Sequence, residues 1–311
     1  MKIISGKQQR PQRVVIYGVE SVGKSTFAAQ FPRPLFLDIE GGSAHLDVDR
    51  AEIGSWKELN EAVAEAARLD YQTIVIDSAD WAERLAVEEL LATNKKSSVE
   101  DFGYGKGWVM AAEKVSRLLT ALDGLIAAGK NVVVIAHSKV QRVEPPDLLA
   151  AYDRYELKLS KQSSPLVKEW ADELWFFRFK VKAISQDGGK AKGVGGKERV
   201  IFTTHSAAYD AKTRSGLAEE LPMEFASVAH LFKTPAAAKP APAVAIIGKE
   251  TNDAVDLLEA HEGAVNAFLL GNGSITEGQT WRDASAKLLA QIMSRPQALV
   301  TKATAPVEVA A

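Results

Sequence analysis

A glycine-rich stretch near the start of the sequence, residues 18 to 26, limits the possible folds of this chain more than any other feature. It fits the pattern G-x-x-x-x-G-K-[ST]. The apolar, β-branched run at residues 13 to 17 before it predicts a buried strand, and residues 27 to 30 after it are compatible with a helix. Backbone N–H groups in such a turn between strand and helix bind phosphate. The sequence therefore predicts a nucleoside-triphosphate site.

The predicted loop assigns a part in binding ATP and Mg²⁺ to several of its residues. We expect Gly18 and Gly23 to allow sharp backbone turns, Lys24 to reach the β- and γ-phosphates, and the Ser25 hydroxyl to ligate Mg²⁺. Glu20 has no evident role by charge beside a phosphate. A chance match is the alternative, against which the flanking strand and helix argue. The predicted nucleotide-binding set is Gly18, Val19, Glu20, Ser21, Val22, Gly23, Lys24, Ser25 and Thr26.

Composition narrows the class of protein further. An apolar content of 46% over 311 residues supports a sizeable core, and a net charge of −2 means that nucleic acid would have to be bound by a local patch. The absence of cysteine excludes disulfides and thiolate metal sites. No apolar run approaches about 18 residues and no secretory signal opens the chain, so we expect a cytoplasmic protein without a membrane partner.

Apolar runs alternate with helical patterns from residue 13 to residue 137. The runs at 34–40, 73–78 and 131–136 predict further buried strands, and residues 115–126 carry the i, i+3, i+4, i+7 spacing of an amphipathic helix. This alternation predicts an α/β fold, a P-loop NTPase with a mainly parallel central sheet flanked by helices. Ligands of such sheets bind at the carboxyl ends of the strands. The residues that converge there are Gly18, Glu40, Asp77 and His137.

The rest of the chain is divided by composition. We predict an N-terminal arm at 1–12, an ATPase core at 13–232, an Ala/Pro-rich linker at 233–248, a small helical C-terminal unit at 249–300 and a flexible tail at 301–311.

Within the predicted core, two runs predict an antiparallel extension, Leu174–Ile184 and Glu198–Thr204. We expect residues 139–162 to form a polar loop, with a short helix starting at Ser164. A solvated loop is expected around Asp47, Asp49 and Glu52.

Two carboxylates at strand ends are candidates for catalysis. Asp77 ends an apolar strand, where a Walker B acid would hold Mg²⁺; capping the following helix is its alternative role. Glu40 could orient the attacking water and accept its proton, although Asp38 or Asp80 could do so instead. His137 ends the fourth strand, where it could sense the γ-phosphate or serve only as an ordinary hydrogen-bonding group.

The segments 18–25, 36–40 and 74–78 together resemble the core of RecA-type recombinases. The resemblance implies that Glu40 is the catalytic base. It also implies a γ-phosphate sensor at the position of His137, where that family usually has Gln.

The segment 211–216 is similar to the Lys-x-Arg-x-Gly segment of hexameric replicative helicases of the RecA superfamily. The similarity implies that Lys212 and Arg214 reach the γ-phosphate bound by a neighbouring subunit and neutralise transition-state charge. A solvated basic turn is the alternative. If the fingers act in trans, the ATPase is complete only in a homo-oligomer.

Residues 12–230 look most like the phage-encoded, RecA-like single-strand annealing or recombinase proteins, on the strength of segments 100–107 and 153–172 and the Lys-x-Arg-x-Gly-Leu ending. The resemblance implies a DNA-stimulated ATPase that binds single-stranded DNA. A single-strand-binding protein is a further expected partner.

Three basic and aromatic stretches could contact single-stranded DNA, since such proteins combine a basic groove with stacking platforms. They are Lys95–Trp108, Lys139–Tyr155 and the Lys180–Arg199 hairpin with Lys190, Lys192 and Lys197. Ordinary solvated loops are the alternative for each stretch.

Three other functions are open at this point. One is a ring-helicase motor, disfavoured because no N-terminal ring domain is evident. Another is a scaffold in which ATP organises assembly without being hydrolysed. A small-molecule kinase is disfavoured by the lack of an evident lid.

Overall fold

The structure is a computed structural model that describes residues 5–6, 10–144, 150–186 and 190–232, together with parts of 258–303. The chain divides into two compact units, Met1–Ala243 and Val244–Ala311, which are described separately. The predicted linker at 233–248 lies outside the described residues.

The first unit is built on a central sheet whose described strands follow the order β10-β8-β7-β1-β5-β4-β2-β3. The pairs β1–β5, β1–β7, β4–β5, β2–β4 and β2–β3 are parallel, whereas β7–β8 and β8–β10 are antiparallel. The strands are β1 (Arg13–Gly18), β2 (Pro34–Asp38), β3 (Asp49–Glu52), β4 (Thr73–Asp77), β5 (Asn131–Val143), β6 (Tyr152–Leu157), β7 (Glu173–Gln186), β8 (Lys190–Phe202), β9 (Lys212–Thr213) and β10 (Glu220–Pro222).

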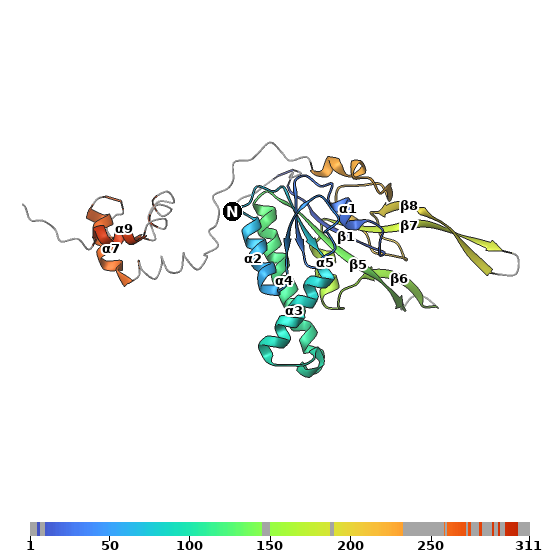
Figure 1. The fold of residues 1–311 in the computed structure, drawn as a ribbon, viewed down its shortest axis with the longest axis horizontal. Coiled ribbons are helices and arrows are strands. Elements are labelled where there is room, and N and C mark those ends of the chain that lie inside the picture. The colour runs from blue at the N-terminus through green and yellow to red at the C-terminus, as the bar shows by residue number, and fades with distance from the viewer. Residues whose placement is uncertain are drawn as a thin grey trace, which may run out of the picture. The chain divides into compact units, whose positions relative to one another are not determined.

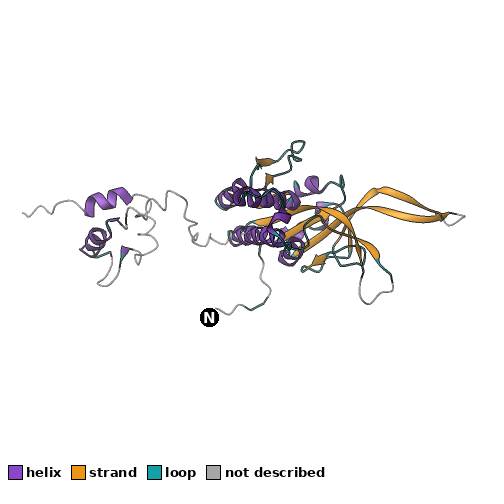
Figure 2. Ribbon diagram, turned by 90° about the horizontal axis from the view of Figure 1, so that it is seen from below, coloured by secondary structure: helices purple, strands orange, loops and turns teal. Residues whose placement is uncertain are grey.

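Helices cover both faces of this sheet (Figures 1 and 2). Four longer helices pack on one face, against strand residues such as Val15, Ile74 and Val134. They are α2 (Trp56–Ala66), α3 (Ala79–Asn94), α4 (Lys106–Ala127) and α5 (Ser163–Trp170). The other face packs on α1 (Lys24–Ala28) and on the 3₁₀ helices η2 (Phe225–Ser227) and η3 (Ala229–Phe232); a third, η1 (Val99–Phe102), lies between α3 and α4.

This architecture confirms the predicted α/β fold with a mainly parallel sheet. The central strands β1, β4 and β5 bury nearly all of the residues that were predicted from continuous apolar runs. The strand register aligns Gly18 with His137 and Asp38 with Asp77, so the carboxyl ends of four strands meet at one edge.

The prediction of a polar loop at 139–162 is wrong. Strand β5 continues past His137 to Val143 and pairs antiparallel with β6, so a β-hairpin follows the core strand directly. Its side chains are mostly part-exposed and its sequence is polar, so the apolar signal that marks buried strands is missing. The short helix predicted at Ser164 begins one residue earlier, as α5.

The antiparallel extension is present as β7 and β8, and both strands are longer than predicted because they continue beyond the sheet as a two-stranded arm (Figure 1). Helix α1 runs from Lys24 to Ala28 and so contains part of the segment predicted to be compatible with a helix. One further prediction needs correction. Residues 49–52 form edge strand β3 instead of a loop, because their backbone pairs with β2 while the Asp49 and Glu52 side chains stay exposed.

The second unit contains two described helices, α7 (Glu262–Gly271) and α9 (Pro296–Ala303). Among its described residues, those that are buried are Leu258, Val265, Leu269, Trp281, Ile292 and Val300. None of the described helices combines the length and hydropathy that spanning a bilayer requires.

Candidate nucleotide-binding site

The loop between β1 and α1 has the backbone conformations that its sequence pattern requires. Gly23 has φ 99°, in the left-handed region that favours glycine. Gly18 is required for a different reason, since a Cβ at this position would lie 2.1 Å from the carbonyl oxygen of Phe177 on the adjacent strand β7. Gly23 therefore allows the loop to turn, and Gly18 allows β1 and β7 to approach each other closely.

Lys24 is folded into this loop. Its buried Nζ donates hydrogen bonds to the carbonyl oxygens of Gly18 (3.3 Å) and Val19 (3.2 Å). Burial lowers the pKa of this ammonium, and the nearby carboxylates Asp77 and Asp80 act in the opposite direction. The loop therefore holds the Lys24 ammonium in place before a phosphate binds.

The two residues predicted to hold a metal are in direct contact. The Ser25 hydroxyl donates a 2.7 Å hydrogen bond to Oδ2 of Asp77 at the end of β4. Burial raises the pKa of Asp77 to about 6, although the Ser25 hydrogen bond favours the ionised form. Oxygen atoms of a hydroxyl and a carboxylate, together with phosphate, suit Mg²⁺. This pair fits the magnesium ion that P-loop NTPases usually bind with their nucleotide.

Three carboxylates were candidates for the catalytic base, and the structure gives two of them other partners. Asp38 is buried and accepts hydrogen bonds from the backbone N–H groups of Gly41 (2.8 Å) and Ser43 (3.0 Å) and from the Ser43 hydroxyl (2.5 Å). Asp80 accepts from Ser78 and contacts His137.

The third candidate, Glu40, remains available. Its backbone N–H donates to the carbonyl of Asp77, which holds it beside the predicted metal ligands. The Glu40 side chain is 31% exposed, and its Oε1 lies 3.8 Å from Nε2 of His137. The structure thus favours Glu40 over Asp38, although its catalytic role remains a prediction.

His137 is oriented by Asp80. Its Nδ1 lies 2.9 Å from Oδ2 of Asp80, and its backbone N–H donates to Oδ1 (3.1 Å). The Asp80 carboxylate raises the pKa of His137, and the imidazole contributes to lowering the pKa of Asp80. Nε2 consequently faces Glu40, and the chain runs on from His137 into the β5–β6 hairpin.

The predicted finger residues lie at the opposite edge of the sheet. Strand β9 pairs Lys212 with Leu174 and Thr213 with Glu173, at the start of β7, and Glu173 in turn aligns with Val14 near the start of β1. Lys212 donates to the carbonyl of Lys168 (2.7 Å), and the Arg214 guanidinium pairs with Asp172 (2.7 Å). The chain does not bring either cation to its own phosphate loop.

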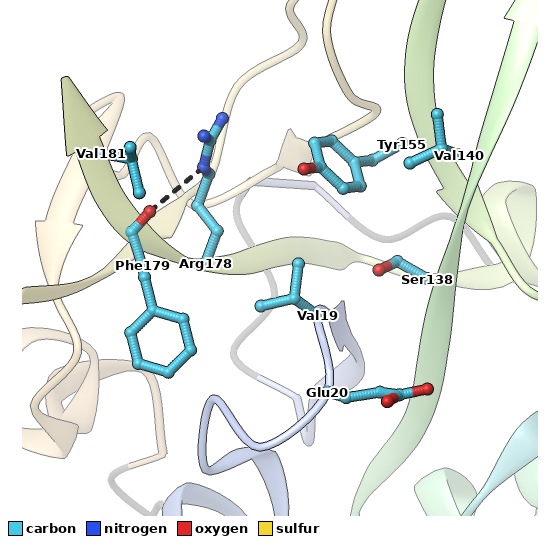
Figure 3. Close-up of a pocket in the computed structure, with 8 residues that line it drawn as sticks. All are labelled: Val19, Glu20, Ser138, Val140, Tyr155, Arg178, Phe179 and Val181. Carbon is cyan, nitrogen blue, oxygen red and sulfur yellow. Dashed lines mark hydrogen bonds between the residues drawn. The ribbon is translucent and has the colours of Figure 1, made fainter. Parts of the chain in front are cut away.

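A cavity of about 490 Å³ adjoins the phosphate loop between the two hairpins (Figure 3). The guanidinium of Arg178 lies 5.7 Å from the ring centroid of Tyr155 across it. The lining residues are Val19, Glu20, Ser138, Val140, Tyr155, Arg178, Phe179 and Val181. The predicted DNA-contact stretches 139–155 and 180–199 thus meet here, whereas residues 95–108 do not line the cavity and lie around η1. Side chains of Lys190 and Lys192 lie outside the described part of the chain.

Arg199 is a residue whose position the sequence pattern does not reveal. It lies in the β7–β8 hairpin that is predicted to contact DNA, and its Nη1 also donates to the carbonyl oxygen of Val22 in the phosphate loop (3.3 Å). No local motif marks a cation that reaches a loop 177 residues earlier in the chain.

The strand–loop–helix geometry around Lys24, with Ser25 against Asp77, defines a nucleotide-binding P-loop NTPase. Residues 10–215, two thirds of the chain, match the model of the AAA domain family AAA_24. The chain therefore belongs to this family.

The chain is also similar to the SPbeta prophage-derived uncharacterized protein YorG of Bacillus subtilis strain 168. The two are 30% identical over 136 residues, which cover 40% of each chain. The similarity thus spans less than half the length of that relative.

Proposed function

We propose that this protein is a phage-encoded, RecA-like ATPase that binds single-stranded DNA in an ATP- and Mg²⁺-dependent way and promotes annealing or strand exchange. The observation that carries the ATPase part is the contact of Ser25 with Asp77, next to an available Glu40. The prophage origin of the relative supports the phage context.

Each catalytic side chain is proposed to contribute one step. Ser25 and Asp77 would hold Mg²⁺, which would stabilise negative charge on the phosphates. Glu40 orients a water and accepts its proton, for which its part-exposed carboxylate is better placed than the buried Asp38. Lys24 neutralises charge that develops on the phosphates.

The cavity between the hairpins is the proposed entry to the DNA site. Tyr155 offers an aromatic face and Arg178 a cation, which is the combination that binds single strands with little sequence preference. The exposed Val140 and Val181 flank it. Because β5 joins His137 to this hairpin without a break, a γ-phosphate sensed at His137 would bias the DNA-contacting segment.

An oligomer is proposed because the finger segment lies at the far edge of its own sheet. Lys212 and Arg214 can then meet a γ-phosphate only in a neighbouring subunit. The side chain of Arg214 is 55% exposed, so a neighbour can reach it.

The central test is the ATPase rate of the full chain with and without single-stranded DNA, compared with Glu40→Gln. We expect stimulation by DNA and a loss of roughly 100- to 10,000-fold in the variant, with nucleotide binding retained. Unchanged hydrolysis in Glu40→Gln would exclude Glu40 as the base. Nucleotide binding without any hydrolysis would favour the scaffold.

Two further assays separate the remaining readings. Annealing of complementary strands without duplex unwinding supports the proposal, whereas unwinding with 5′ or 3′ polarity would support the helicase motor.

Mixing Lys24→Ala with Arg214→Ala subunits tests the finger. Mixed oligomers should regain activity, because some interfaces then combine an intact loop with an intact finger, and no recovery at any ratio would contradict action in trans.

A further inference from the structure

Arg199 on β8 approaches the phosphate loop closely. Besides the hydrogen bond to the Val22 carbonyl, its Nη1 lies 2.8 Å from the position that a Cβ would take at Gly23. Met223 lies against the same point, with its Cε 3.5 Å away, and its backbone N–H donates to the Arg199 carbonyl (3.2 Å). The guanidinium thus occupies space that the absence of a side chain at Gly23 leaves open.

The backbone around Arg199 is irregular. The β7–β8 pairing aligns Phe179 with Arg199 but Val181 with Gly195, so the register shifts next to the arginine. Gly195 and Gly196 both have positive φ, at 116° and 89°. Bulges of this kind re-aim a side chain and are common beside active sites. Here the irregular segment lies between Gly195 and Arg199, so it directly precedes the arginine that contacts the phosphate loop.

Arg199 also differs from a neighbouring cation in its ion pairs. Its neighbour on the adjoining strand, Lys180, pairs with Glu198 and Glu220. Within the described residues, no carboxylate pairs with Arg199. It is therefore a cation without an acidic partner next to the loop.

Carboxylates outnumber cations around the loop. The acidic side chains whose fields act on Lys24 are Asp77, Asp80, Glu40 and Glu20. A polyphosphate bound there would add further negative charge, which Lys24 and one Mg²⁺ would have to balance. An additional cation beside the loop would reduce this repulsion.

We propose that Arg199 is a nucleotide-binding residue that pairs, within the same chain, with the α- or β-phosphate. In loops of this pattern the backbone around Gly23 cradles these two phosphates, so a guanidinium beside Gly23 acts on them and not on the γ-phosphate. Arginine suits this part because its five N–H donors bind phosphate oxygens in a fixed fork. The inference rests on the proposed nucleotide site and adds a residue to it.

This assignment separates two arginines by their effects. Arg199 would support the binding of ADP and ATP alike, whereas the proposed finger Arg214 would support hydrolysis and leave ADP binding unchanged.

The test measures affinity by titration calorimetry of the full chain with ADP and ATP in the presence of Mg²⁺. We expect Arg199→Ala to weaken both ligands by a similar factor of about 10 to 100. Arg199→Lys should recover part of this loss, and the loss should shrink at high salt. Lys57→Ala, which removes an exposed cation on α2 outside the site, should change affinity less than twofold.

Two results would overturn the inference. One is an affinity of Arg199→Ala within twofold of the natural protein. The other is a loss of affinity that accompanies a lower melting temperature of the nucleotide-free protein and that lysine does not reduce, since Arg199 would then only brace Val22. If the natural protein binds neither nucleotide, the proposed function itself fails.

Discussion

The two edges of the central sheet carry buried carboxylates in opposite situations. At the carboxyl edge, Asp77 has one hydroxyl donor, from Ser25, and burial raises its pKa to about 6. At the amino edge, Glu173 is fully buried but accepts four hydrogen bonds. These come from the backbone N–H groups of Arg214 and Ser215, the Ser215 hydroxyl and the Trp175 indole.

Asp172 repeats the pattern of Glu173, since it pairs with the guanidinium groups of Arg10 and Arg214 and accepts from the backbone of Arg13. Buried carboxylates that are fully hydrogen-bonded hold a structure together, whereas those left short of donors are placed for a ligand. The comparison supports the proposal that Asp77 binds Mg²⁺, whereas the carboxylates at the amino edge fix the segment that contains Arg214.

The largest difference is expected from Asp77→Asn. Hydrolysis should fall about 1,000-fold or more, because a bound metal contributes several kcal/mol of charge stabilisation and this change removes one of its anionic ligands. Asparagine can still accept from Ser25 and removes a buried charge, so the nucleotide-free protein should be no less stable. ATPase rates and thermal melting measure the two effects.

Asp38→Asn is the matched control for this prediction, since Asp38 ends the neighbouring strand and is also buried. Its three hydrogen bonds to Gly41 and Ser43 would be weakened, so this variant should lose stability. The comparison would fail if Asp77→Asn lowered the melting temperature as much as Asp38→Asn.

The carboxyl edge was largely predictable from sequence, and the reason is local. Continuous apolar runs mark the buried parallel strands, and the residue after each run must lie at the carboxyl edge. Gly18, Asp77 and His137 could be placed in this way. The choice of Glu40 over Asp38 could not be made from spacing, because it depends on the hydrogen bonds that Asp38 makes to the next loop.

The amino edge and the hairpins were less accessible to sequence analysis. The pairing of β9 with β7 joins residues about 40 positions apart, and no periodicity in either segment announces it. The same holds for Arg199 at Val22. The β5–β6 hairpin was missed because its part-exposed strands are polar, so burial could not be read from composition.

At the amino edge, the matching change is Glu173→Gln. The amide N–H₂ group of glutamine would face one of the four groups that donate to Glu173, and that buried donor would lose its acceptor. The free energy of unfolding should therefore fall by about 4 kcal/mol. Urea unfolding of the full chain measures this loss.

The exposed Glu169, which precedes the same strand, offers a control in Glu169→Gln with little expected change. Equal stability of Glu173→Gln and the natural protein would mean that the four hydrogen bonds do not support the fold.

The smallest expected effect is a pH dependence specific to the carboxyl edge. Burial raises the pKa of Asp77 from 3.8 to about 6, so between these values the folded protein holds a proton that the unfolded chain has released. The stability of the natural protein relative to Asp77→Asn should therefore fall by about 2 to 3 kcal/mol as the pH rises from about 4 to about 7, and then stay level. Urea unfolding of both proteins without divalent cations at several pH values measures this difference. A relative stability that rose with pH over this range would mean that donors satisfy Asp77 as fully as they do Glu173, and the contrast between the two edges would be lost.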